Sequence, residues 1–425
     1  MECKKNYMTS LFVAIVVMIL PLFLSFHLTK GMSYSNITKF CFFIVIIICN
    51  ISKGKIIRAQ FSKEFLLLFI IFLFFQLAAV MNGYIINGFL LTNDVFNIIG
   101  KAIMIYTFIV IPSCQTVSEE VFIDFTKKFT ILSLFICLFN FFDNYKMITN
   151  FFNISNSYQF NVTGVFANRN QLGSFMFISI IAHIYYNTRK SLSKLDYVIY
   201  IVQFVNLILS MSRAAMLATG IFLLFYIGIY KRFLSRHPIF TIIAICLICL
   251  LFTNDSLWCF IQNNIIRSEV GNSGRSEVWL TGIGIANNNI SSLFIGQGLF
   301  HGISIAQSTG MSFDQFHSFY VDTLVSGGVV ELLFLVALFV YIAIKAIKCS
   351  NIELKWVYFS SLIGYLTLCF FESDSVLSIG YVDTINTIFF VTIPILISGM
   401  KKSESKAIES QTYAHNLIKR ESEYY

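Results

Sequence analysis

Charged residues are scarce in this sequence: Asp, Glu, Lys and Arg make up only 12% of its 425 residues. A soluble domain has about 25% charged residues, so an ordinary soluble fold is excluded. Proline is rare as well, with four residues, whereas phenylalanine occurs 47 times and 57% of the chain is hydrophobic. The mean hydropathy is +0.75. We therefore expect a protein that crosses a membrane several times.

Several other features are missing. No Walker-type glycine loop occurs, so the sequence offers no nucleotide site, and the basic residues give no reason to expect nucleic acid as a partner. The apolar run after MECKKNYMTS lacks a small-residue cleavage site and reads as a first span rather than a signal peptide. Ten cysteines are present, but most lie inside apolar runs, including Cys246 and Cys249 in ICLICLLF. This placement indicates packing sulfur and predicts no disulfide framework.

Apolar runs of about 17–25 residues predict membrane spans. Twelve are found, near residues 10–28, 36–51, 64–81, 95–113, 126–142, 170–187, 196–211, 214–230, 238–253, 318–344, 356–372 and 384–400. They predict an all-α, polytopic bundle of about 12 transmembrane helices. The division is a membrane domain of nine helices over 1–253, a loop over 254–317, the last three helices over 318–400, and a tail over 401–425.

The basic residues predict the orientation, because cytoplasmic loops of membrane proteins are enriched in Lys and Arg. With the N-terminus in the cytoplasm, most of the 30 basic residues fall on the cytoplasmic side and both termini are cytoplasmic. The long loop over 254–317 and the segment near 151–170 then lie outside. The cytoplasmic loops are short, so we expect any chemistry on the outer face.

Three of the arginines on the outer side stand out, where this rule disfavours them: Arg169, Arg213 and Arg275. Each can be explained as an interfacial residue that extends to lipid headgroups or caps a helix. The alternative is that the arginines converge. Guanidinium groups bind phosphate oxygens in two-pronged fashion and stay charged, so two of them could hold a lipid-linked diphosphate without a metal ion.

His317 lies at the junction of the outer loop and an apolar span. Asp314 could cap the following helix and place His317 in its first turn, near the positive end of the helix dipole. A neutral imidazole there could accept a proton from an attacking hydroxyl group. Two alternatives remain: a histidine that is only a polar group at the interface, and a metal site with His301 and Asp314, whose spacing matches no standard ligand pattern.

An ordered set of motifs over roughly residues 160–345 resembles the O-antigen polymerases and O-antigen ligases of bacterial surface-polysaccharide assembly. GVFANRNQLG is followed by SRAAML, which fits an R-x-x-x-L pattern through Arg213 and Leu217. GRSEVW and IGQGLF come next, and then HSFYVDTLVSGG, where His317 and Ser318 precede Gly328. Glu331 departs from the ligase form of the pattern. The first half of the chain is similar only in its hydrophobic layout.

The resemblance implies a glycosyltransferase of the bacterial inner membrane whose active site faces the periplasm, with 254–317 as a periplasmic loop. It would take a glycan from undecaprenyl diphosphate and join it to an acceptor sugar, without a metal ion or other cofactor. Arginines at the positions of Arg213 and Arg275 would bind the diphosphate, and a histidine at that of His317 would orient or deprotonate the acceptor hydroxyl. Further candidates for substrate binding are Asn168, Arg169 and Asn170.

Two acceptors fit this chemistry. A polymerase lengthens a lipid-linked chain by repeat units, whereas a ligase moves the finished chain onto lipid A–core. A polymerase could also have a chain-length regulator as a partner. GVFANRNQLG and the departure at Glu331 favour the polymerase. A flippase for lipid-linked glycans is a third alternative. It would place charges along a path inside the spans, whereas most charges here lie at span ends and Lys101 is the main ambiguous case.

Overall fold

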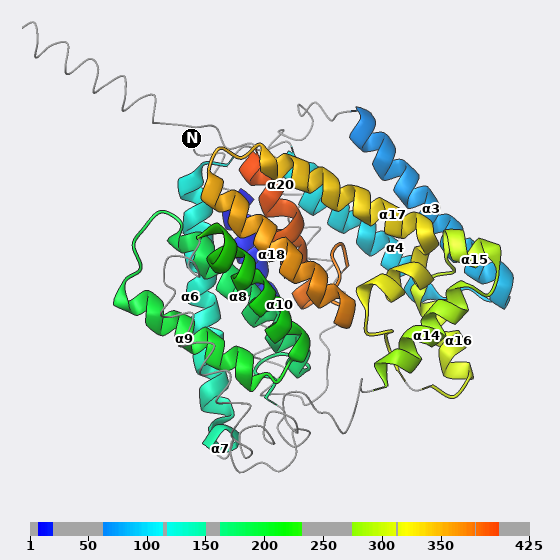
Figure 1. Ribbon diagram of the computed structural model, residues 1–425. Coiled ribbons are helices and arrows are strands. Elements are labelled where there is room, and N and C mark those ends of the chain that lie inside the picture. Colours follow the sequence, from blue (N-terminus) through cyan, green and yellow to red (C-terminus); the bar gives the residue numbers. More distant parts are fainter. Residues whose placement is uncertain are drawn as a thin grey trace, which may run out of the picture.

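The computed structural model describes residues 7–19, 63–113, 117–149, 162–231, 274–311, 313–378 and 380–398. All regular elements of these residues are helices, as the all-α prediction requires, and Figure 1 shows them gathered into one bundle. Their bounds are Tyr7–Ile19, α3 Lys63–Asn87, α4 Thr92–Ile105, η1 Tyr106–Val110, α5 Ile111–Ser113, α6 Glu119–Asp143, α7 Tyr145–Thr149, α8 Arg169–Asn187, α9 Lys194–Leu209, α10 Arg213–Leu223, η3 Leu224–Tyr230, α14 Arg275–Ala286, α15 Ile290–Ile295, α16 Leu299–Ser308, α17 Phe319–Ile347, α18 Ile352–Phe371, α19 Tyr381–Thr387, η6 Ile388–Thr392 and α20 Ile393–Ser398.

Six stretches of the described chain are long and apolar enough to cross a membrane: Phe69–Asn87, Thr92–Ser113, Arg213–Tyr230, Phe319–Ile347, Ile352–Phe371 and Tyr381–Ser398. Each coincides with a predicted span. The spans predicted near 126–142, 170–187 and 196–211 are helical too, as α6, α8 and α9, without meeting that criterion. Those near 36–51 and 238–253, and residues 20–28 of the first, lie outside the described residues. The chain is thus a multi-pass membrane protein, and the count of twelve stays a prediction.

The helix α8 runs through the centre of the bundle. Every residue from Leu172 to Tyr185 is buried, and α8 packs against α6, α9, α10 and α18. A helix enclosed by protein on all sides can carry polar residues such as Ser179 and His183, because neighbouring helices rather than lipid surround them. Around it lies a core rich in phenylalanine and tyrosine, in which the rings of Tyr365 and Phe390 stack with centroids 4.1 Å apart.

Two prolines explain two widened helical turns. Pro112 follows η1 and Pro394 follows η6. In an α-helix the carbonyl of Phe108 would bond to the N–H of residue 112, but proline has no N–H to donate. The hydroxyl of Thr392 in η6 donates to this carbonyl instead, at 2.8 Å. The Phe108 carbonyl therefore joins η1 to η6.

The segment predicted as an outer loop is helical where it is described. The helices α14, α15 and α16 pack against α17, and α15 also packs against α3; Figure 1 shows them together at one end of α17 and α3. Their contact has a small apolar core of its own, with Ala286, Ile303 and Phe316 buried against Val325 of α17. This core positions the end of the loop that carries His317.

Two glycine motifs meet where α17 is kinked. Gly328 has a φ of 67°, and Gly327 beside it is also non-helical. The break leaves the carbonyl of Val325 free to accept a hydrogen bond from the N–H of Gln297 at 3.1 Å. A Cβ atom on Gly296 would lie 2.5 Å from the Cα atom of Gly327, so the contact requires glycine. IGQGLF and VSGG therefore form one docking contact between the α15–α16 connection and α17.

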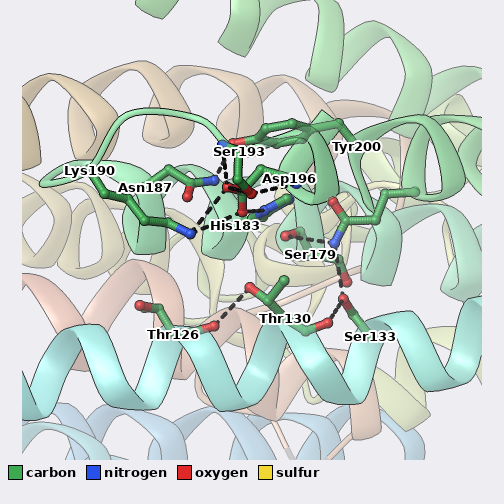
Figure 2. A network of polar contacts seen from close by, with 11 residues as sticks. Thr126, Thr130, Ser133, Ser179, His183, Asn187, Lys190, Ser193, Asp196 and Tyr200 are labelled. Atoms are coloured by element: carbon green, nitrogen blue, oxygen red, sulfur yellow. Dashed lines mark hydrogen bonds and ion pairs between the residues drawn. The ribbon is translucent and has the colours of Figure 1, made fainter. Parts of the chain in front are cut away.

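A polar network holds the other end of α8 (Figure 2). Asp196, in the first turn of α9, forms a capping box with Ser193. One of its carboxylate oxygens lies 3.2 Å from His183 Nε2 and 3.1 Å from Lys190 Nζ. Farther into the bundle, the Gln203 amide donates to the Ser133 hydroxyl at 3.0 Å and joins α9 to α6. This network fixes the α8–α9 hairpin at the end that is predicted to be cytoplasmic.

Candidate active site at the end of α18

Four helix termini meet at Glu372, the residue that ends α18. Arg275, the first residue of α14, donates from Nη2 to Glu372 Oε1 at 2.7 Å and from Nη1 to the carbonyl of Phe371. Asn170, in the first turn of α8, donates to Glu372 Oε2 at 3.0 Å. The N–H of Phe319, the first residue of α17, donates to the Glu372 carbonyl at 3.0 Å. The N-terminal residues of α8 and α14 thus bind one buried carboxylate, and the N-terminus of α17 binds the backbone carbonyl of the same residue.

His317 stands immediately before α17 and not in its first turn. The predicted cap by Asp314 is wrong: the N-cap residue is Ser318, and His317 has a φ of 54°, which lies outside the helical region. The carboxylate that orders the loop comes from the helix itself. Asp322 Oδ1 accepts a hydrogen bond from the N–H of Phe316 at 2.9 Å. The sequence pattern predicted an acidic residue that orders the start of the helix, but that residue is Asp322 and not Asp314.

The contacts of His317 connect it to α14. The indole N–H of Trp279 donates to the His317 carbonyl at 3.3 Å, so that GRSEVW and HSFY lie together. Burial and the nearby charge of Arg275 lower the pKa of His317, against a smaller opposing effect of Asp314. Since the ordinary pKa is about 6.5, the imidazole is neutral at pH 7. A neutral imidazole is the form that can accept a proton.

The ring nitrogens of His317 are not equivalent. Its Nδ1 lies 3.2 Å from the side-chain amide of Gln315. The amide nitrogen of Gln315 faces it and donates, so Nδ1 holds the lone pair and Nε2 carries the proton of the neutral ring. In that arrangement Gln315 orients the ring.

The residues Asn168, Arg169 and Asn170 have two different roles. Asn168 is the N-cap of α8, and its side chain accepts from the N–H of Gln171 at 2.9 Å. Asn170 contacts Glu372, and burial raises the pKa of this glutamate while the charge of Arg169 is among the effects that oppose the shift. The structure therefore gives Asn168 a capping role and brings Arg169 and Asn170 to the Glu372 group.

Arg213 is the first residue of α10 and follows a tight turn in which Met211 has a φ of 50°. A Cβ atom on Gly173 would lie 2.5 Å from the Cβ atom of Ser212, so the start of α10 packs closely on the first turns of α8. Arg213 therefore begins a helix beside the one that carries Asn170. The direct contacts to Glu372 described above come from Arg275 and Asn170.

Residues 198–336 match the family model described as O-Antigen ligase. This match, over less than half of the chain, supports the O-antigen polymerase and ligase superfamily. No curated protein matches the chain. The matched region contains Arg213, Arg275 and His317, whereas Asn170 and Glu372 lie outside it. Members of the superfamily act on lipid-linked glycans, and the match does not distinguish a polymerase from a ligase.

Two acidic residues beside this superfamily region were missed by the sequence analysis. Burial raises the pKa of Glu372, although Arg275 and Asn170 oppose the shift. Burial also raises the pKa of Asp374, and the neighbouring Glu372 and Asp383 raise it further. Asp374 accepts a hydrogen bond from Ser174 of α8. The available signal was the acidic segment ESDS between two predicted spans, on the side predicted to lie outside.

His301, considered above as a metal ligand, has a different set of contacts. Its Nδ1 lies 2.7 Å from Asp94 Oδ2, and its Nε2 lies 2.8 Å from the carbonyl of Phe89. Asp94 also accepts from the backbone N–H groups of Phe300 and His301, at 3.0 and 3.1 Å. The carboxylate therefore caps α16 from the first turn of α4 and joins the two helices.

Proposed function

We propose that the protein is an O-antigen polymerase. It joins undecaprenyl-diphosphate-linked oligosaccharide repeat units on the periplasmic face of the bacterial inner membrane. The observation that supports this most directly is the convergence of Arg275 and Asn170 on Glu372, next to His317, in a chain of the O-antigen superfamily. Glu331, which departs from the ligase form of the motif, favours the polymerase.

The reaction needs a proton acceptor and an anion site. The oxygen of an acceptor hydroxyl attacks the anomeric carbon of the donor sugar, and its proton passes to the imidazole of His317. The bond from that carbon to the diphosphate oxygen breaks, and the electron pair leaves with undecaprenyl diphosphate. One glycosidic bond replaces one sugar–phosphate bond, with inversion at the anomeric carbon.

Arg275 is suited to bind the leaving diphosphate. Its guanidinium group has five N–H donors, and the contacts to Phe371 and Glu372 orient it while engaging only one donor on each terminal nitrogen. The side chain keeps 20% of its surface exposed. The remaining donors and the N-terminal ends of α8, α14 and α17 favour a negatively charged ligand. Arg213 and Arg169, at the starts of α10 and α8, would add positive charge to the same side.

The ligase is the second candidate, because the matched family is described as O-Antigen ligase. A polymerase and a ligase share the donor and differ in the acceptor, so the deletion strain separates them. We expect lipopolysaccharide of the strain to carry a core with a single repeat unit on a gel. Bare core with accumulated lipid-linked polymer would instead assign the ligase reaction, and unchanged polysaccharide would contradict both.

The proposed topology has twelve spans, with α14–α16 in the periplasm. Two exposed serines test it: Ser308 ends α16, and Ser350 follows α17 at its other end. In a chain without its ten native cysteines, we expect Ser308→Cys to react with a membrane-impermeant thiol reagent in cells whose outer membrane is permeabilised. Ser350→Cys serves as the control and should stay unlabelled until the inner membrane is opened. The reverse pattern would invert the orientation and remove the site from the periplasm.

A further inference from the structure

A polar cavity of about 190 Å³ lies next to the proposed active site. It is bounded by α4, by α17 with the segment before it, and by the segment after α18. The lining residues that matter here are Lys101, Gln315, Phe319, Asp322, Glu331 and Ser373. Gln315 is the residue whose amide contacts His317 Nδ1, at 3.2 Å. The cavity therefore reaches the histidine through one side chain.

A buried ion pair forms one wall of this cavity. The Lys101 ammonium donates to Glu331 Oε1 at 2.6 Å, to Gln76 Oε1 at 2.7 Å and to Ser326 Oγ at 3.2 Å. These three contacts use all three of its N–H donors. The side chains of Lys101 and Glu331 are only 12% and 5% exposed. Ionised groups at such positions within membrane helices are costly to bury, which indicates a function for the pair.

The second carboxylate oxygen of Glu331 differs from the first, which binds Lys101. Oε2 is buried and has no hydrogen-bond partner in the part of the chain that the structure describes. An unpaired acceptor on a charged group is destabilising, and Lys101 has no further donor to give it. The group that satisfies Oε2 must bring an O–H or N–H of its own.

The charge of the lining excludes one class of ligand. Asp314, Asp322, Glu331 and Asp383 all line the cavity, and the positive charge of Lys101 is already paired. A diphosphate would be repelled by this lining, whereas a neutral ligand with several hydroxyl groups would donate to it. The volume lies below the roughly 300 Å³ at which pockets for drug-sized ligands begin, so it suits a single ring.

We propose that this cavity binds one neutral sugar ring of the acceptor glycan, whose hydroxyl groups donate to Glu331 and Asp322. The inference rests on the proposed function. The first sugar of the donor is unsuitable, because its directly attached diphosphate would enter the acidic lining. A ring bound here stands beside Gln315, so the cavity helps to present the acceptor hydroxyl to His317.

The test uses the full chain, purified in detergent, and saturation-transfer NMR with methyl glycosides of neutral hexoses and N-acetylhexosamines. The double variant Lys101→Met/Glu331→Leu replaces the ion pair by apolar side chains of similar size, a change that buried pairs tolerate well. We expect the wild type to transfer saturation to the ring protons of at least one glycoside. In the double variant the affinity should fall about tenfold or more, with a similar rise in acceptor KM and an unchanged donor Kd.

Lys128→Met/Asp124→Leu is the matched control, because it removes an exposed ion pair of α6. It should keep wild-type glycoside binding, and an unchanged melting temperature verifies that both double variants fold. Failure of the wild type to bind any glycoside, equal binding by Lys101→Met/Glu331→Leu, or displacement of the glycoside by pyrophosphate would each overturn the proposal. Glycoside binding is measured without turnover. If the protein proved not to be a polymerase, that finding alone would therefore produce none of these three results.

Discussion

Replacing His317 with alanine should lower turnover on the order of a hundredfold or more, which is the usual contribution of a general base. The acceptor hydroxyl would lose the imidazole that takes its proton. Binding of the lipid-linked donor should survive, because the arginines supply that interaction. The measurement is chain growth by the purified variant on lipid-linked repeat units, with donor binding determined separately.

The pH dependence provides an independent check of this role. The protonated imidazole cannot act as a base, and the pKa of His317 is lowered by burial and by Arg275. The neutral form therefore persists to below the ordinary pKa of about 6.5, and activity should decline only below that pH. His317→Gln should lose this acid limb while keeping an orienting hydrogen bond. Full turnover in His317→Ala, or the same acid limb in His317→Gln, would make the histidine a structural residue.

Several residues of the candidate site could be selected from the sequence because charge in a membrane protein is conspicuous. Arg275 and His317 were identifiable as polar residues at the ends of apolar runs, and Arg213 as an arginine in a very short loop. The helices were predictable as well, since an apolar run of this length in a membrane protein can satisfy its backbone hydrogen bonds in few structures other than a helix. The match over residues 198–336 agrees with the motifs that suggested the family.

The partners of these residues could not be predicted, because they depend on how distant helices meet. Glu372 lies 97 positions from Arg275 and 202 from Asn170 along the chain, and no periodicity links them. The pairing of Lys101 with Glu331, 230 positions apart, depends on the kink of α17 at Gly327 and Gly328. His317 likewise has a left-handed conformation and accepts a hydrogen bond at its carbonyl from Trp279, 38 positions away, neither of which the assignment of Asp314 as the cap included.

The second large effect is expected at Arg275, where structure and substrate binding can be separated. Arg275→Met should lower donor affinity about ten- to a hundredfold through loss of a charge-assisted contact. It also leaves the Glu372 carboxylate, which is 5% exposed, without its ion-pair partner. Removing one member of a buried pair costs about 3–5 kcal/mol, so the melting temperature of the purified protein should fall as well.

The double variant Arg275→Met/Glu372→Gln distinguishes the two roles. It leaves no unpaired charge, so the melting temperature should recover, whereas donor affinity should stay low because the guanidinium group is still missing. Arg189→Met is the matched control: its guanidinium pairs with Glu119 near the other end of α8 and is 57% exposed, so both quantities should change little. If the double variant regains donor affinity together with stability, Arg275 only neutralises Glu372, and the diphosphate must be bound by other groups, with Arg213 and Arg169 the next to test.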